Sequence, residues 1–267
     1  MSTVLLTPYD LALAAGMMSL LALTSIWLQL HVARTILVAM VRMMAQLLLV
    51  GLVLKTLFSH ATPLWVAGMA GVMLLMAGRE VSARQRRRLT HWWSYGIGTA
   101  AMTLSGFTVC VLALRVIVQP VPWYSPQYAI PMLGMILGNT MNGVALGIDR
   151  VTQGAWEQRD IIEARLLAGE SWREAFGGVA RDSVRTALIP IMNSMAAAGV
   201  VSLPGMMTGQ ILGGNPPVEA VKYQILIFLL IGTAVGAGSI TAVALTARRL
   251  FDARHRLRID RLRATRV

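Results

Sequence analysis

The chain has little charge and almost no cysteine. Charged residues make up 13% of its 267 residues and hydrophobic residues 56%, whereas soluble domains carry about 25% charged residues. The single cysteine, Cys110, excludes an internal disulfide and a cysteine-based metal motif. The sequence also lacks the phosphate loop G-x-x-x-x-G-K-[ST], the zinc motif H-E-x-x-H and the nucleophile elbow of hydrolases. These absences argue against a soluble enzyme, so we expect no catalytic residue and no cofactor bound by this chain.

Long hydrophobic runs, by contrast, are frequent, and short basic segments separate them. A helix needs about 20 apolar residues to cross a bilayer core of about 30 Å. We therefore predict an all-α, polytopic membrane protein with about seven transmembrane helices. The predicted spans are Pro8–Leu30, Thr35–Phe58, Pro63–Ala77, Trp92–Val118, Pro126–Ile148, Thr186–Leu212 and Val218–Leu245. The sixth is expected to be interrupted by Pro190 and by Leu203-Pro204-Gly205.

Three predicted helices start with a hydroxyl residue followed by proline, namely Thr7-Pro8, Thr62-Pro63 and Ser125-Pro126. The hydroxyl can cap the helix, and proline fits the first position because the N–H that it lacks would be unpaired there. Asp10, three residues after Thr7, is expected to complete the first cap.

Basic residues are distributed asymmetrically along the chain. Most of the 24 Lys and Arg residues lie in alternate loops and in the C-terminal tail. Cytoplasmic loops carry an excess of such residues, so we predict an N-terminus outside and a C-terminus in the cytoplasm. We treat 1–267 as a single transmembrane domain, with a cytoplasmic segment at 149–185 and a basic cytoplasmic tail at 248–267.

The segment 149–185 differs from the other basic loops because acidic residues alternate with its arginines. Its apolar residues, among them Leu167, Trp172 and Phe176, predict short amphipathic helices. Such helices lie on a membrane surface or dock into a groove of a partner protein.

A few polar residues interrupt the predicted spans. An arginine at the centre of a span costs about 2.5–3.5 kcal/mol on insertion scales, so Arg42 should pair, snorkel or face a cavity. Broken backbone at membrane depth needs protein or a water-filled cavity to satisfy it. We hypothesise that the polar and broken positions form a substrate pathway, whose candidate residues are Arg42, Gln46, Asn139, Asn142, Asn193, Ser202, Pro204, Gly205 and Met206. The alternative is that they only hold helices together, and that the break at Pro204 is a kink or a re-entrant turn.

Five motifs are specific enough to indicate a family. They are Val41-Arg42-x-x-Ala45-Gln46-Leu47, Ile130-Pro131-Met132-x-Gly134-Met135-Ile136-x-Gly138-Asn139, Arg181-Asp182-Ser183-Val184-Arg185-Thr186-Ala187-Leu188-Ile189-Pro190, Val200-Val201-Ser202-Leu203-Pro204-Gly205-Met206-Met207-Thr208-Gly209-Gln210 and Pro217-x-Glu219-Ala220-x-Lys222-Tyr223-Gln224-Ile225. Together they resemble the bacterial iron-export ABC transporter permease family, whose relatives include plant aluminium-tolerance permeases. The segment from Glu163 to Ala175 also resembles the coupling loop through which ABC permeases contact their ATPase.

The resemblance implies the permease subunit of an iron exporter in the bacterial inner membrane. It implies a permease homodimer with two copies of a separate ABC ATPase, which binds ATP and Mg. Because isolated polar groups in hydrocarbon need partners, we expect the pathway residues to face a shared polar cavity near the dimer axis. The implied partners are therefore the ATPase, a second copy of the chain and the lipid bilayer, with no nucleic acid. The implied coupling residues are Glu163, Ala164, Leu167, Gly169 and Trp172.

Other functions remain open at this point. The cargo of an ABC exporter could be another metal, a metal chelate or a nucleotide sugar. A secondary transporter without an ATPase would want acidic residues deep in its spans, whereas Asp10 and Glu219 lie in first turns. A scaffold or receptor is a further class. The metal ligands are unknown, because all four histidines fall in loops or at helix ends, and Fe(II) prefers oxygen and nitrogen donors to the thioethers of the 17 methionines.

Overall fold

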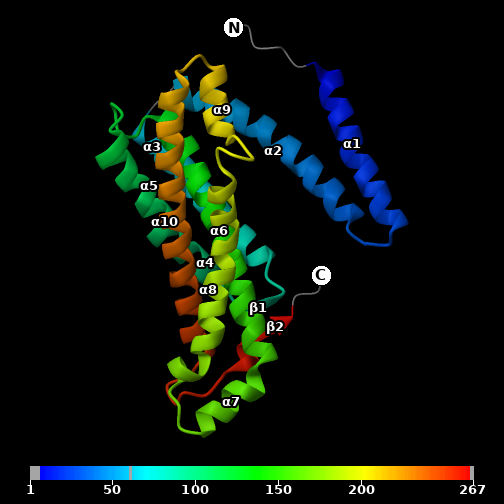
Figure 1. Ribbon diagram of the computed structural model, residues 1–267, viewed down its shortest axis with the longest axis vertical. Coiled ribbons are helices and arrows are strands. Elements are labelled where there is room, and N and C mark those ends of the chain that lie inside the picture. Colours follow the sequence, from blue (N-terminus) through cyan, green and yellow to red (C-terminus); the bar gives the residue numbers. More distant parts are fainter. Residues whose placement is uncertain (1–6, 60–61, 265–267) are drawn as a thin grey trace. The chain divides into compact units, whose positions relative to one another are not determined.

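The protein is described by a computed structural model, which covers residues 7–59 and 62–264 (Figure 1). His60, predicted in a loop, and the last three residues of the basic tail lie outside the described residues. The chain forms two compact units, Met1–Ala61 and Thr62–Val267.

The first unit is a helical hairpin of α1 (Pro8–Trp27) and α2 (Ala33–Ser59), which pack against each other. The predicted cap at its start is confirmed. The backbone N–H of Asp10 donates to the Thr7 hydroxyl at 3.4 Å, and the backbone N–H of Thr7 donates to the Asp10 carboxylate at 2.8 Å. Both helices are long and apolar enough to span a membrane.

The second unit is a helical bundle with a small sheet at one end (Figure 1). Its first part contains α3 (Pro63–Ala83), β1 (Arg87–Leu89), α4 (Trp93–Met102), a π-helical turn Thr103–Phe107, α5 (Thr108–Leu112) and a second π-helical turn Ala113–Val118. Its second part contains α6 (Pro126–Glu157), α7 (Arg159–Leu167), α8 (Trp172–Ala197), α9 (Gly205–Leu212), α10 (Pro217–Leu250), the 3-10 turn Ile259–Arg261 and β2 (Leu262–Ala264). Thr62 and Ser125 precede α3 and α6 as predicted, but in this described part of the chain neither hydroxyl makes a capping hydrogen bond.

The all-α membrane architecture is confirmed, with one correction to the spans. Across the described residues, six helices are long and apolar enough to cross a membrane: α1, α2, α3, the continuous helix Trp93–Val118, α6 and α10. The predicted sixth span, Thr186–Leu212, is not one helix but the end of α8, an extended turn and α9. Pro190 does not interrupt α8, which continues to Ala197. A proline costs one backbone hydrogen bond, and neighbouring groups commonly compensate for it in membrane helices.

The core of the second unit lies where α6, α8 and α10 pack together. Small residues let these helices approach closely, as is common in membrane bundles. A methyl group at Gly143 of α6 would lie 2.7 Å from Cγ1 of Val235 on α10. Cys110 is buried, as expected for a small apolar side chain.

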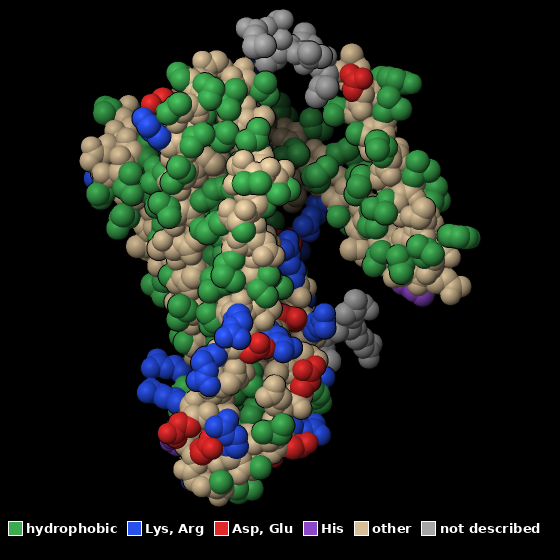
Figure 2. All heavy atoms as spheres, in the orientation of Figure 1, with side chains coloured by type: hydrophobic (Ala, Val, Ile, Leu, Met, Phe, Trp, Pro, Cys, Tyr) green, Lys and Arg blue, Asp and Glu red, His purple; other side chains and the backbone are tan. Residues whose placement is uncertain are grey.

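The basic end of the bundle is where charged side chains gather over α7 and the lower ends of α8 and α10 (Figure 2). The predicted loop 149–185 is mostly helical there, because α6 continues to Glu157 and α8 already begins at Trp172. A two-stranded antiparallel sheet, which the sequence did not reveal, pairs Arg87 of β1 with Ala264 of β2. This sheet ties the C-terminal tail to the loop after α3.

Candidate substrate pathway and coupling surface

A polar cavity of about 510 Å³ opens within the apolar helices of the second unit. We call it the amide cavity, because the side chains of Asn139, Asn193 and Gln224 all line it. Elements α6, α8, α9 and α10 contribute its walls. The full lining is Met135, Asn139, Asn193, Ser194, Ala197, Ser202, Pro204, Gly205, Met206, Gln224, Ile227, Phe228 and Ile231.

The broken helix predicted at Leu203-Pro204-Gly205 forms one wall of this cavity. Helix α8 ends at Ala197, and Gly199 adopts a positive φ of 81°, which glycine tolerates without a steric penalty. The turn is closed by the backbone N–H of Gly199, which donates to the carbonyl of Ser202 at 2.9 Å. Pro204 then precedes the first residue of α9. The break is therefore an extended turn between two helices, and Ser202 within it lines the cavity.

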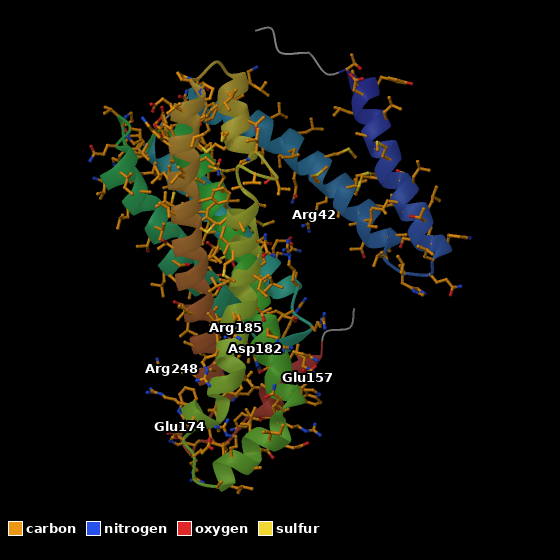
Figure 3. The ribbon with its side chains drawn as sticks, in the orientation of Figure 1. Arg42, Glu157, Glu174, Asp182, Arg185 and Arg248 are labelled. Carbon is orange, nitrogen blue, oxygen red and sulfur yellow. The ribbon has the colours of Figure 1, made fainter. Side chains whose placement is uncertain are left out.

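Six of the predicted pathway residues lie around the amide cavity: Asn139, Asn193, Ser202, Pro204, Gly205 and Met206. Asn142 does not, because its side-chain oxygen accepts a hydrogen bond from Nη1 of Arg84 at 2.7 Å. Arg42 and Gln46 lie one turn apart on α2, in the first unit (Figure 3 labels Arg42). Their part in a shared pathway stays a prediction.

Gln224 is the pathway candidate that the sequence analysis missed. Gln224 is 8% exposed, and its Oε1 has no hydrogen-bond partner among the described residues. A buried acceptor without a partner costs about 1–3 kcal/mol, so it needs water or a ligand. The available signal is that Gln224 is the only amide side chain in the sequence of α10.

A second polar cavity, of about 460 Å³, adjoins the first. We call it the Glu219 cavity, after its one carboxylate, which pairs with Nζ of Lys222 at 2.7 Å. Met135 of α6 and Met206 of α9 line both cavities. The two methionines thus form a wall shared by both cavities.

The predicted coupling residues lie at the basic end. Glu163 and Leu167 of α7 line a cavity of about 470 Å³, which we call the tail groove, together with Leu166, Glu170 and the tail residues Arg254–Leu257. Leu167 is 89% exposed. Ala164 is also exposed on α7, and its carbonyl accepts the N–H of Ala168 at 3.0 Å. Gly169 follows with a φ of 93°, which ends α7 and turns the chain toward α8.

Trp172 serves a different purpose from the other predicted coupling residues. Its ring stacks on Phe251 at a centroid distance of 5.4 Å, and its backbone N–H donates to Nδ1 of His255 at 3.4 Å. Ser171 caps α8 just before it, and the hydrogen bond that the Ser171 hydroxyl donates to Glu174 lowers the pKa of that carboxyl. Trp172 therefore fixes the start of α8 against the tail.

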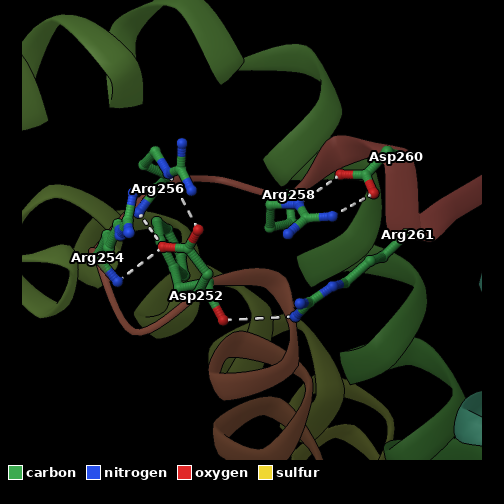
Figure 4. Close-up of polar contacts among 7 residues, drawn as sticks. Asp252, Arg254, Arg256, Arg258, Asp260 and Arg261 are labelled. Atoms are coloured by element: carbon green, nitrogen blue, oxygen red, sulfur yellow. Dashed lines mark hydrogen bonds and ion pairs between the residues drawn. The ribbon is translucent and has the colours of Figure 1, made fainter.

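The tail that forms one side of this groove is held by its own ion pairs (Figure 4). Asp252 accepts hydrogen bonds from the backbone N–H groups of Arg254 and Arg256 at 2.9 and 3.0 Å. The bond from the Arg256 N–H is the main cause of a lowered pKa of the Asp252 carboxyl. Asp260 pairs with Arg258 at 2.9 Å. The groove wall is therefore an ordered structure.

The chain is a multi-pass α-helical membrane protein, because its described part contains six helices able to span a membrane. A broken helix lies beside a polar cavity in the same bundle. A family model described as "Uncharacterised protein family (UPF0014)" matches residues 8–251, and the chain belongs to this family. No solved structure matches the chain.

Three relatives illustrate the family. The "UPF0014 membrane protein slr1647" of Synechocystis is 37% identical over 86% of this chain and 88% of its own length. The "Probable iron export permease protein FetB" of Escherichia coli is 34% identical over 97% of each chain. The "Protein ALUMINUM SENSITIVE 3" of Arabidopsis thaliana is 29% identical over 76% of this chain and 72% of its own length. These matches confirm the predicted relation to bacterial iron-export permeases and their plant relatives.

Proposed function

We propose that the chain is the membrane-spanning permease subunit of an ABC transporter that exports iron across a bacterial inner membrane. The main support for this proposal is the amide cavity, which is lined by six of the predicted pathway residues. The chain also aligns along 97% of its length with a relative named as a probable iron export permease. Two permease copies and two copies of a separate ATPase, which binds ATP and Mg, complete the transporter. The single permease domain of 1–267 includes both compact units.

The chemistry of the amide cavity favours a metal ion that is transported with its water molecules or chelator still bound. The donors at the wall are amides, hydroxyls and thioethers, which are weaker ligands for Fe(II) than carboxylates or imidazoles. Six water molecules around an ion fill roughly 180 Å³ at about 30 Å³ each, so a hydrated or chelated ion fits the cavity of about 510 Å³. Export of another metal or of a metal chelate is the second candidate, favoured by the same neutral donors.

The transport experiment uses the permease and its ATPase reconstituted together in vesicles. We expect ATP-dependent movement of iron in one direction, and no movement when ATP is replaced by a non-hydrolysable analogue. ATP-dependent movement of a different metal without movement of iron would favour the second candidate. Iron movement that follows a proton gradient in the absence of the ATPase would instead identify a secondary transporter.

The pathway is tested by cysteine labelling in a Cys110→Ala background. A cysteine at Ser202 or Asn139 should react with a small water-soluble thiol reagent, and ATP or cargo should change the rate. Asn142→Cys is the matched control, since Asn142 is on the same helix but is bonded to Arg84 and lies outside the cavity lining. Equal, ATP-independent labelling at Asn139 and Asn142 would place the pathway elsewhere.

We further propose that the ATPase docks at the tail groove and the exposed side of α7. Leu167 and Ile161 expose apolar side chains there, 89% and 61% respectively, at an end of the molecule otherwise rich in charge. An exposed apolar residue on a short helix, framed by charged side chains, is a common form of docking element. Glu163, Ala164 and Gly169 would then set the orientation and length of that helix.

A further inference from the structure

Two apolar grooves flank the basic end of α10. The first, of about 570 Å³, lies between α4 and α10 and is lined mainly by Trp92, Trp93, Ile97 and Leu245. The second, of about 560 Å³, lies between α8 and α10 and is lined mainly by Trp172, Ala180, Ala244 and Leu245. Both grooves share Leu245 and end at Arg248.

The charge around these grooves has one sign. Arg248 lines both, Arg249 lines the first and Arg173 lines the second. No Asp or Glu is among the described residues lining either groove, and no carboxylate of the described chain pairs with Arg248 or Arg173. Arg249 and Arg173 instead face the rings of Trp93 and Trp172 at 4.3 and 5.5 Å. Each groove is thus lined by positive charge as well as by apolar side chains.

The position along the helix matches the boundary between a bilayer and water. Trp side chains concentrate at the level of lipid headgroups, and Trp92, Trp93 and Trp172 all lie at this end of α10. Beyond Arg248 and Arg249 the chain passes into the charged tail, while before Leu245 the exposed side of α10 is apolar, as at Ile240. Figure 3 places Arg248 at the lower end of α10, beside the start of α8.

We propose that this site binds one anionic diacyl phospholipid, with its phosphate on Arg248 and its acyl chains along the two grooves. Basic pockets between membrane helices bind such headgroups because the arginine and the phosphate carry opposite charges. Two apolar grooves that share one arginine fit the shape of a lipid with two chains and one phosphate. The bound lipid would hold the basic end of α10 to α4 and α8.

Native mass spectrometry of the full chain in detergent, with phosphatidylglycerol and phosphatidylcholine of identical acyl chains, tests this proposal. We expect one retained phosphatidylglycerol, and weaker retention of phosphatidylcholine. Arg248→Gln should weaken phosphatidylglycerol retention about fivefold, which corresponds to about 1 kcal/mol for one cation near an anionic headgroup. Arg185→Gln removes the same charge from the same end of the molecule outside both grooves and should leave retention unchanged.

A second variant tests the contribution of the acyl-chain groove to lipid binding separately from that of the arginine. Ala244→Trp fills the groove beside α8 without changing any charge, and it should also lower retention of phosphatidylglycerol. Equal retention of the two lipids, or equal losses in Arg248→Gln and Arg185→Gln, would overturn the proposal in favour of nonspecific attraction. A disulfide between two copies carrying Ala244→Cys, formed in the membrane at high yield, would overturn it in favour of a protein interface.

Discussion

The amide cavity and the basic end both contain many polar side chains, but these side chains differ in the partners that the protein provides for them. The cavity is lined by neutral groups, and Oε1 of Gln224 has no hydrogen-bond partner in the described chain. At the basic end, arginines pair with carboxylates, as in Arg150–Asp182 at 2.8 Å and Arg165–Glu170 at 2.7 Å. The protein therefore pairs several charges of its basic end internally, although Arg248 and Arg173 have no carboxylate partner among the described residues. In the cavity, Oε1 of Gln224 is left for water or a bound molecule.

The physical reason for this difference is the cost of charge in a bilayer. A charged side chain near the centre of a span costs about 2.5–3.5 kcal/mol on insertion scales, while an amide costs less and can still bind polar cargo. At the basic end water lowers that cost, so the chain can place most of its net charge of +12 there. Neutral polar residues in the spans are consequently better indicators of a transport path than the arginine clusters.

The largest expected effect concerns topology, because the orientation of the chain decides whether the basic end faces the cytoplasm. We predict that a tag after Val267 reports from the cytoplasm and a tag before Met1 from outside, although both ends lie outside the described residues. This arrangement requires the α8–α9 segment to cross together with the six other spans. Protease protection of both tags in sealed vesicles measures it. Two tags on the same side would mean that α8 and α9 do not complete a crossing.

The next largest effect is expected at the basic end. Leu167→Glu should abolish stable association with the ATPase and reduce ATP-driven transport to background, since it places a charge in the centre of the proposed apolar contact. Leu167→Met preserves an apolar side chain of similar volume and should retain association. Co-purification of the ATPase measures both variants. Normal association of Leu167→Glu would show that α7 is only a connector between α6 and α8.

In the amide cavity, a smaller effect is expected from Gln224→Leu. Transport should fall about tenfold, equivalent to about 1.4 kcal/mol, through loss of one polar contact with the cargo. The thermal midpoint should be unchanged or raised, because Oε1 of Gln224 contributes no hydrogen bond within the described protein. Vesicle transport and thermal unfolding in detergent measure the two quantities. A large fall in the midpoint would indicate that Gln224 only packs helices.

The smallest effect is expected from the tail carboxylates at acidic pH. The folded-state pKa of Asp252 is lowered, chiefly by the backbone N–H of Arg256, so the charged form stabilises the tail above the unfolded pKa. That contribution is lost as the pH falls through the folded pKa. Asp252→Asn should therefore increase proteolysis of the tail at pH 7, and the difference from the natural protein should disappear in strong acid. A constant difference at every pH would exclude this mechanism.

The sequence predicted most helices because long apolar runs leave few alternatives. Helices α1, α2, α6 and α10 begin within a few residues of their expected starts, with proline at or next to the first position in α1, α6 and α10. Within the sixth span, the break predicted at Pro190 is wrong because α8 accommodates this proline, whereas the break before Gly205 is present and begins where Gly199 turns the chain. The sheet of β1 and β2 was missed since its strands are three residues each and far apart in the chain.

The amino-acid sequence by itself determined the membrane class, the helix starts and the family. Only the tertiary structure decided which polar residues face a cavity. Asn139 and Asn142 are three positions apart and differ by about 60° around α6, so the helical period groups them on one face. Yet Arg84 from the end of α3 binds Asn142, while Asn139 lines the amide cavity. A helix face specifies a direction, and it is the neighbouring helices that determine whether a partner or a cavity lies along it.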